Sequence, residues 1–373
     1  MMQTRRGFLG LALCTAGGAC LSRTGTVGDG ESYSVALLGD THFDSTDTKY
    51  YHSEYLFSTS KARYEAHLQE HVRNAEMWRE RMPSLLRASA ACVTDDTAFV
   101  LQLGDLVQGD CNNPVTHRRM LNDAFSLIKG TYGGKLPLVT VVGNHDIRGD
   151  FPTDGTREAF DAWQPPMMEK ELGQPVKETT FAFRQGPDVF IVVDFNAPRP
   201  DFARLKRLFA ESEGARHTFL ITHGPAIPSG ASRWFLLGSK TRDAERRELL
   251  RLMASRNVIV LAGHTHRLEY YDCVLPEGRV TQLVASSVWT SPKLAVPAVH
   301  AHGASSYGER VKRAKHNKKE LRALVDEYRP FMRDYLFADA AGHFRLEVGP
   351  SRIAAVFYGG SSTVPTRTFV LRG

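Results

Sequence analysis

Short runs rich in apolar residues alternate with longer amphipathic stretches over residues 34–290. Such short runs are typical of strands that are buried on both faces, whereas apolar residues spaced three and four apart indicate helices. The predicted strands are 34–38, 98–103, 136–142, 180–183, 189–193, 218–221 and 258–261, and the predicted helices are 64–91, 116–129, 201–213 and 241–256. This alternation predicts an α/β fold with buried central strands.

The pattern changes in the last third of the chain. Residues 268–288 and 344–371 predict further strands that pair antiparallel. A basic helix at about 305–335 interrupts them and is predicted to be an insertion. We therefore expect a single domain over residues 34–373, preceded by a linker rich in Gly, Ser and Thr.

Composition and charge are those of an ordinary globular protein. Of the 373 residues, 42% are hydrophobic and 24% are charged, which excludes a disordered or collagen-like chain. The formal net charge of +6 comes from Arg5, Arg6 and the segment 309–320, so the rest of the chain is formally neutral. The basic segment is either a solvated helix face or a contact for an anionic surface or an acidic substrate.

Residues 1–33 are predicted to be an export signal and a linker. Arg5 and Arg6 precede an uncharged stretch from Gly7 to Ala19, which is too short to span a bilayer as a helix. Paired arginines followed by Phe-Leu resemble the twin-arginine export signal of bacteria, with an ordinary secretory signal as the alternative. The segment that ends at Cys20 is similar to a lipoprotein cleavage box. We expect a periplasmic protein that is either free or tethered through a lipid, with no transmembrane helix after the signal.

Five predicted strands in succession end in a cluster of polar residues. The clusters are Asp40-Thr41-His42, Gly104-Asp105, Gly143-Asn144-His145-Asp146, His223 and Gly263-His264-Thr265-His266. Because ligands bind at the carboxyl ends of strands in α/β sheets, these residues are expected to converge there. Imidazoles, carboxylates and an amide oxygen together suit Zn, Fe or Mn ions, and a carboxylate such as Asp105 could bridge two of them. Metal binding would also offset the cost of burying so many polar groups.

This run of motifs resembles the calcineurin-like metallophosphoesterase family. The resemblance covers about residues 34–290 and implies a four-layer αββα sandwich, with two mixed sheets flanked by helices and the metal site at the strand carboxyl ends. It implies two transition-metal ions (Fe, Mn or Zn). Asp40, His42 and His266 would hold one ion, Asn144, His223 and His264 the other, and Asp105 would bridge them.

The resemblance also implies a reaction. A hydroxide that bridges two metal ions would attack the phosphorus of a small phosphate mono- or diester. His145 would be catalytic rather than a ligand, protonating or hydrogen-bonding the leaving-group oxygen. Arg148, Arg233 and Trp234 are candidates for substrate contacts, with surface or packing roles as the alternatives.

The chain departs from the motifs of two subclasses of this family, and two alternative functions stay open. Purple acid phosphatases place a Tyr three residues after the Asp of Gly-Asp, where this chain has Gln108. Serine/threonine protein phosphatases continue that motif with Asp-Arg-Gly, which is absent from residues 106–110. A stand-alone phosphomonoesterase or phosphodiesterase remains. The alternatives are a non-catalytic binding protein on the same fold, which recruits a partner through the basic helix, and a nucleic-acid-directed phosphodiesterase.

Overall fold

The computed structural model describes most of the chain outside the N-terminus. The described residues are 23–24, 31–45, 61–111, 113–148, 155–196, 201–228, 243–313 and 318–373. The predicted export signal with Cys20, and the candidate substrate residues Arg233 and Trp234, lie outside these ranges. Among the described residues, no helix is both long enough and apolar enough to cross a membrane.

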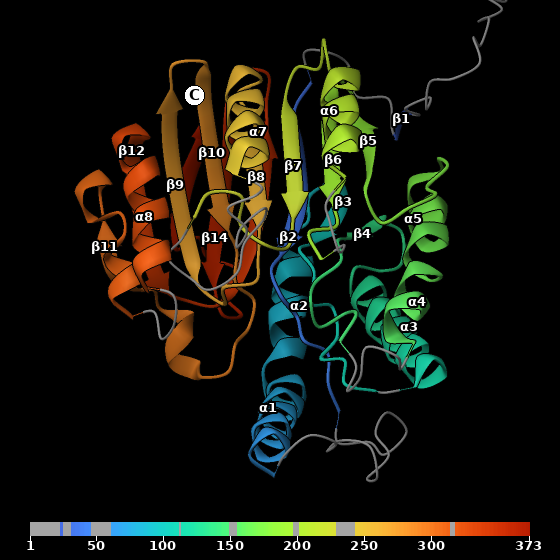
Figure 1. Cartoon of the computed structure of the whole chain (residues 1–373). Helices are drawn as coiled ribbons and strands as arrows, with labels where there is room; N and C mark the ends of the chain where they lie inside the picture. The colour runs from blue at the N-terminus through green and yellow to red at the C-terminus, as the bar shows by residue number, and fades with distance from the viewer. Residues whose placement is uncertain are drawn as a thin grey trace, which may run out of the picture.

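Two mixed β-sheets form the centre of the fold (Figure 1). The nine-stranded sheet runs β1 (Arg23–Thr24), β5 (Phe181–Gln185), β6 (Asp188–Val193), β7 (Thr218–Thr222), β8 (Ile259–Ala262), β10 (Gly278–Val284), β9 (Leu268–Leu275), β12 (Met332–Asp339) and β11 (Ala298–His302). The six-stranded sheet runs β15 (Arg367–Arg372), β14 (Ile353–Gly359), β13 (Gly342–Val348), β2 (Tyr33–Leu38), β3 (Thr97–Gln102) and β4 (Leu138–Thr140).

Helices cover the outer faces of the two sheets. The helices α6 (Phe202–Glu211), α7 (Asp243–Ser255) and α8 (Lys318–Tyr328) lie in front of the nine-stranded sheet in Figure 1. The six-stranded sheet is accompanied by α1 (Lys61–Glu80), α2 (Met82–Ala91), α3 (Pro114–Thr131), α4 (Thr156–Asp161) and α5 (Gln164–Leu172). The prediction of two mixed sheets flanked by helices is therefore confirmed.

Aromatic side chains fill the space between the sheets. The ring of Phe99 on β3 lies 5.5 Å from that of Phe183 on β5 and 5.2 Å from that of Phe190 on β6. All three side chains are buried, which explains why their strands appear in the sequence as nearly continuous apolar runs. A second group of buried apolar residues packs the nine-stranded sheet against its covering helices.

The strand directions bring the polar clusters to one region. β2, β3 and β4 are parallel, so their carboxyl ends lie at the same edge of the six-stranded sheet. β6, β7 and β8 are parallel in the other sheet. The loops that follow β2 and β3 are tied together, because the amides of Thr41 and His42 both donate to the carbonyl of Asp105.

The structure differs from the predicted elements in three places. The predicted helix 64–91 is two helices, because Pro83 at the start of α2 has no amide hydrogen to continue the hydrogen-bond ladder of α1. The pattern also gave no sign of α4, α5, β11 or β12. The predicted basic helix 305–335 instead contains short 3₁₀ turns and α8, and its last residues begin β12.

The basic segment is also not a uniformly solvated face. Arg310 points inward and forms an ion pair with the carboxylate of Glu269, which is fully buried. Lys312 pairs with Glu309. The solvated-face interpretation therefore fails for Arg310, which the spacing of basic residues could not distinguish from its neighbours.

Candidate metal centre

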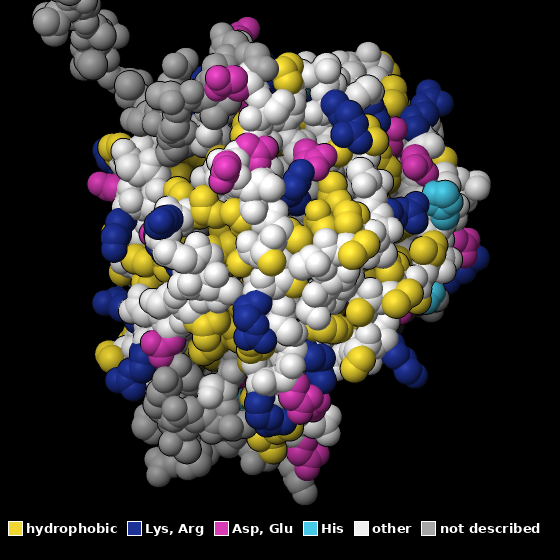
Figure 2. Space-filling view, turned by 180° about the vertical axis from the view of Figure 1, so that it is seen from behind, with side chains coloured by type: hydrophobic (Ala, Val, Ile, Leu, Met, Phe, Trp, Pro, Cys, Tyr) yellow, Lys and Arg dark blue, Asp and Glu magenta, His cyan; other side chains and the backbone are white. Residues whose placement is uncertain are grey.

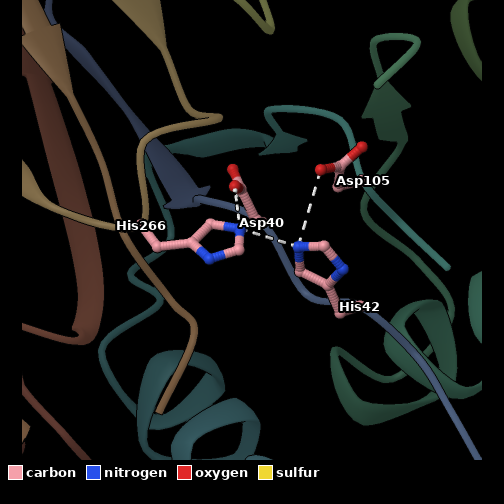
Figure 3. Close-up of side chains that lie close together, drawn as sticks. All are labelled: Asp40, His42, Asp105 and His266. Atoms are coloured by element: carbon pink, nitrogen blue, oxygen red, sulfur yellow. Dashed lines mark hydrogen bonds and ion pairs between the residues drawn. The ribbon is translucent and has the colours of Figure 1, made fainter. Parts of the chain in front are cut away.

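The candidate site lies where the loops after five strands meet. Asp40 and His42 follow β2, Asp105 follows β3, Asn144 and His145 follow β4, His223 follows β7, and His264 and His266 follow β8. In Figure 3, the side chains of Asp40, His42, Asp105 and His266 point toward one another from the loops after β2, β3 and β8. The expected convergence at the strand ends is what the structure shows.

The first group of donor atoms comprises Asp40, His42, Asp105 and His266, all within 4.8 Å of one another. Nε2 of His42 lies 2.9 Å from Nε2 of His266 and 3.5 Å from Oδ2 of Asp105. Nε2 of His266 lies 3.1 Å from Oδ2 of Asp40. Two imidazoles and two carboxylates around one point are a donor set suited to a transition-metal ion.

The second group comprises Asp105, His223 and His264. Nε2 of His223 lies 3.1 Å from Oδ2 of Asp105, and Nδ1 of His264 lies 3.3 Å from Nε2 of His223. The same oxygen of Asp105 therefore faces both groups. A carboxylate oxygen shared in this way is what a pair of adjacent cations requires.

Asn144, in the loop after β4, is a candidate for a further donor. Its Oδ1 atom is buried and has no hydrogen-bond partner in the structure. The next residue, His145, donates its amide to Oδ1 of Asp105 at 2.7 Å, which fixes this loop against the shared carboxylate. A buried carbonyl oxygen without a partner is costly unless a cation or water satisfies it, so the residues present fit a metal centre.

The backbone around the site has an unusual conformation. His42, Asp105, His264 and His266 have positive φ angles of 43°, 49°, 71° and 51°, which residues with a Cβ adopt only at a cost. Gly143 permits this packing, because a Cβ on it would lie 2.0 Å from the amide nitrogen of Asp105. Strained backbone of this kind clusters at functional sites, where the surrounding fold enforces it.

Comparisons with known proteins were consistent with this geometry. The sequence profile described as calcineurin-like phosphoesterase matches residues 33–268, which is more than half of the chain. The chain belongs to the calcineurin-like phosphoesterase family. A search of curated proteins gave no match.

Solved structures show the same fold at low sequence identity. The structure of PhoD is 13% identical with a TM-score of 0.51, and the match covers 94% of this chain and 70% of that one. Purple acid phosphatase PPD1 from yellow lupin (Lupinus luteus) seeds is 12% identical with a TM-score of 0.53. That match covers 93% of this chain but only 55% of the lupin chain, so this phosphoesterase spans about half the length of that neighbour.

Burial and the two carboxylates set the protonation of the histidines in this phosphoesterase. Burial lowers the pKa of His42 to about 4 and that of His264 to about 3. For His223, burial acts in the same direction, but the carboxylates of Asp105 and Asp40 outweigh it and raise the pKa to about 9. The nearby histidines hold the pKa of Asp105 well below its usual value despite burial. Ionised carboxylates and neutral imidazoles are the forms that bind metals, so His42 and His264 are already in the ligating form, whereas His223 must release a proton when an ion binds.

His145 and Arg148 lie together at the edge of the site. Nδ1 of His145 donates to the carbonyl of Gln108 at 2.9 Å, so its Nε2 is left as an acceptor, 3.2 Å from Nη1 of Arg148. Arg148 is held by Asp110, to which its Nε donates at 2.7 Å, and by Glu70. Burial and the adjacent guanidinium both keep the pKa of His145 well below its ordinary value.

Sequence reasoning missed a group of residues on α1 that support the site. Trp78 donates its indole N–H to the carbonyls of Thr41 and His42, at 2.8 and 2.9 Å. Asn74 and Glu70 both contact Gln108, whose side chain in turn contacts Nδ1 of His42. Glu70, Asn74 and Trp78 recur every four residues, so the signal that could have revealed them was a polar stripe on one helix face.

Proposed function

We propose that this protein is a binuclear metal-dependent phosphoesterase that hydrolyses a small phosphate mono- or diester. The observation that carries this proposal is the position of Asp105, whose Oδ2 faces both groups of donor atoms. Asp40, His42 and His266 would hold one Fe, Mn or Zn ion, and Asn144, His223 and His264 the other. When bound, such ions supply Lewis acidity and lower the pKa of coordinated water.

The residues beside the donor groups have distinct proposed roles. Arg148 offers guanidinium N–H groups to a phosphoryl oxygen, and Asp110 holds it in place through two hydrogen bonds. His145 serves the leaving-group oxygen. A bound phosphate ester brings negative charge beside Arg148, which offsets the guanidinium and raises the pKa of His145 toward the range of a proton donor.

The charges on one face of the molecule and in the described part of the basic segment favour a small ester over a nucleic acid. On the face shown in Figure 2, Lys and Arg side chains are spread singly and are interspersed with Asp and Glu. Nucleic-acid affinity rests on a clustered basic surface that neutralises several phosphates. In the basic segment, Arg310 and Lys312 are each paired with a glutamate.

The test of this proposal is metal content together with turnover. The purified mature chain is expected to contain close to two metal ions and to hydrolyse an aryl phosphate or a bis-aryl phosphate. Asp105→Asn should lose both properties, because it removes the shared charge. The matched control is Asp188→Asn, which alters an equally buried carboxylate that pairs with Arg216 away from the site. It should lower stability but keep both ions. Absence of turnover with Mn²⁺, Fe²⁺ and Zn²⁺ would contradict the proposal.

Export to the periplasm is a further part of the proposal. Its support is the paired Arg5 and Arg6 ahead of an uncharged stretch. Changing both residues to Lys should retain the protein in the cytoplasm of a bacterial host, as measured by cell fractionation. Unchanged export of that variant would favour the ordinary secretory signal instead.

A further inference from the structure

Gln108 is a buried residue outside the proposed ligand set, and its side chain contacts His42 while its main chain contacts His145. It is 1% exposed, and its Oε1 accepts from Nδ2 of Asn74 at 2.6 Å and lies 3.1 Å from Nδ1 of His42. Its Nε2 donates to Oε2 of Glu70 at 3.3 Å. Its main-chain carbonyl accepts from His145 at 2.9 Å. Every polar atom of the Gln108 side chain therefore has a partner.

These contacts fix the direction of the hydrogen bond to His42. A carboxylate can only accept, and the pKa of Glu70 is lowered because Arg148 outweighs the effect of burial, so the Nε2 end of Gln108 must face Glu70. The carbonyl end then faces Asn74 and His42. An amide oxygen can only accept, so Nδ1 of His42 must carry the hydrogen, and the lone pair lies on Nε2.

We propose that Gln108 is a positioning residue that fixes His42 in the tautomer with its hydrogen on Nδ1. In this tautomer the lone pair of Nε2 is available to a metal ion. This atom lies 2.9 Å from Nε2 of His266 and 3.5 Å from Oδ2 of Asp105. Gln108 thereby selects the ring nitrogen that the first ion would use. The inference rests on the proposed function for the existence of that ion, but the tautomer itself does not.

The side chain and the main chain of Gln108 act on different rings. Its side chain contacts His42, whereas His145 is held by its carbonyl, which a substitution leaves in place. The rings of His42 and His145 pack edge to face with their centroids 4.5 Å apart. A change of the Gln108 side chain should therefore alter the tautomer of His42 without altering that of His145.

The first test is nuclear magnetic resonance of ¹⁵N-labelled mature protein stripped of metal with a chelator. Two-bond proton–nitrogen correlations identify which ring nitrogen carries the hydrogen, and a His42→Gln sample assigns the signals of this residue. We expect the Nδ1–H form in the wild type and a mixture of tautomers in Gln108→Met. A wild-type ring with its hydrogen on Nε2 would overturn the proposal, whether or not the variant folds.

The second test is metal affinity, measured by titration with Zn²⁺ in competition with a chromophoric chelator. Gln108→Met should weaken binding of one ion by roughly 10- to 100-fold, which is the usual effect of losing a partner of a ligating histidine. The affinity for the other ion should stay within about threefold of the wild-type value. The matched control is Gln174→Met, a buried glutamine that donates to the carbonyl of Ala182 away from the site. It should change neither affinity.

A double variant tests whether the tautomer of His42 and the metal affinity can be restored. Gln108→Glu alone places two carboxylates against each other, whereas Glu70→Gln combined with Gln108→Glu reverses the donor and acceptor and keeps an acceptor for His42. The pair should restore the Nδ1–H tautomer and most of the lost affinity. Three outcomes would each overturn the inference. Gln108→Met could lower the affinity for both ions equally, it could lower neither, or the control Gln174→Met could show the same loss.

These outcomes separate this inference from the proposed function. A wild type that binds two ions and turns over substrate, but has its His42 hydrogen on Nε2, contradicts only the role of Gln108. A wild type with the Nδ1–H tautomer that never turns over a phosphate ester contradicts only the proposed function.

Discussion

The two halves of the candidate metal centre hold their histidines in different ways. In the first half, which contains Asp40, His42 and His266, Nδ1 of His42 contacts the side chain of Gln108. In the second half, which contains Asn144, His223 and His264, Nδ1 of His223 donates to the main-chain carbonyl of Leu103 at 2.7 Å. One substitution removes a side-chain partner. A main-chain carbonyl at the end of a strand stays in place after a substitution, because the sheet fixes its position.

The electrostatic surroundings of His42 and His223 also differ. Burial is the dominant influence on His42 and lowers its pKa to about 4. His223 is equally buried, but two carboxylates outweigh that effect and raise its pKa to about 9. The comparison shows that His42 is positioned by a side chain that α1 holds, while His223 is positioned by a strand end and by the charges of two carboxylates.

The largest effect is expected from a change that damages both halves at once. In Gly143→Ala, the added methyl group would meet the amide and the carboxylate of Asp105 at 2.0 and 2.1 Å, which displaces the shared ligand. Turnover should fall by roughly 10²- to 10³-fold or more, a loss typical of misplaced charge stabilisation, and metal content should drop. Gly130→Ala is the control, because nothing lies within 4 Å of its added methyl. Normal metal content in Gly143→Ala would contradict the geometry.

A smaller effect is expected at Arg148, which we propose contacts the substrate rather than either ion. Arg148→Lys loses the two-point contact with Asp110 and should lower kcat/KM by roughly 10- to 100-fold, with both ions retained. Steady-state kinetics and metal analysis check this. The control Arg157→Lys changes an arginine that pairs with Asp161 and Asp194 outside the site. If Arg148→Lys releases metal, Arg148 belongs to the metal support instead.

A still smaller effect should be confined to the first half. Trp78→Phe removes the N–H that donates to the carbonyls of Thr41 and His42. The affinity for one ion should therefore fall by about threefold to tenfold, in line with the loss of about 1 kcal/mol of hydrogen bonding. Metal titration checks it. Trp163→Phe is the control, since that indole donates to Asn122. If Trp78→Phe lowered the affinity for both ions equally, the proposed distinction between the two halves would be wrong.

A histidine away from the metal centre tests whether burial alone lowers the pKa of a histidine in this fold. His343 is fully buried on β13, away from the metal centre, and burial lowers its pKa to about 4, as for His42. The unfolded chain binds the proton more tightly, so stability is complete above about pH 6.5 and is lost as the pH falls toward 4, by at most about 3 kcal/mol.

This prediction is checked by urea unfolding of metal-stripped protein at several pH values. His343→Gln keeps a donor for the carbonyl of Ser362, which His343 contacts at 3.0 Å, and should reduce the loss of stability at low pH. An unchanged dependence on pH would show that burial does not act on this histidine as described, and would weaken the same explanation for His42.

Much of the fold, and the convergence of the candidate ligands, could be predicted from the sequence because the strand pattern and the polar residues after each strand are local signals. A strand buried on both faces must be apolar throughout, as β2 and β3 are, and the residue that follows it stands at the sheet edge. Asp40, Asp105 and His223 could therefore be placed together without coordinates. The break between α1 and α2, and the strands β11 and β12, were missed because their apolar spacing does not separate them from a neighbouring helix.

The sequence by itself determined which residues reach the candidate metal centre, since each lies within four residues of the end of an apolar strand. Only the tertiary structure decided what supports them. Asn74 and Gln108 are 34 residues apart, and Arg310 lies 41 residues from Glu269, so neither pair leaves a periodic signal along the chain. Such pairs form because packing α1 and the basic segment against the sheets buries polar groups, and a buried polar group must find whichever partner the fold brings near.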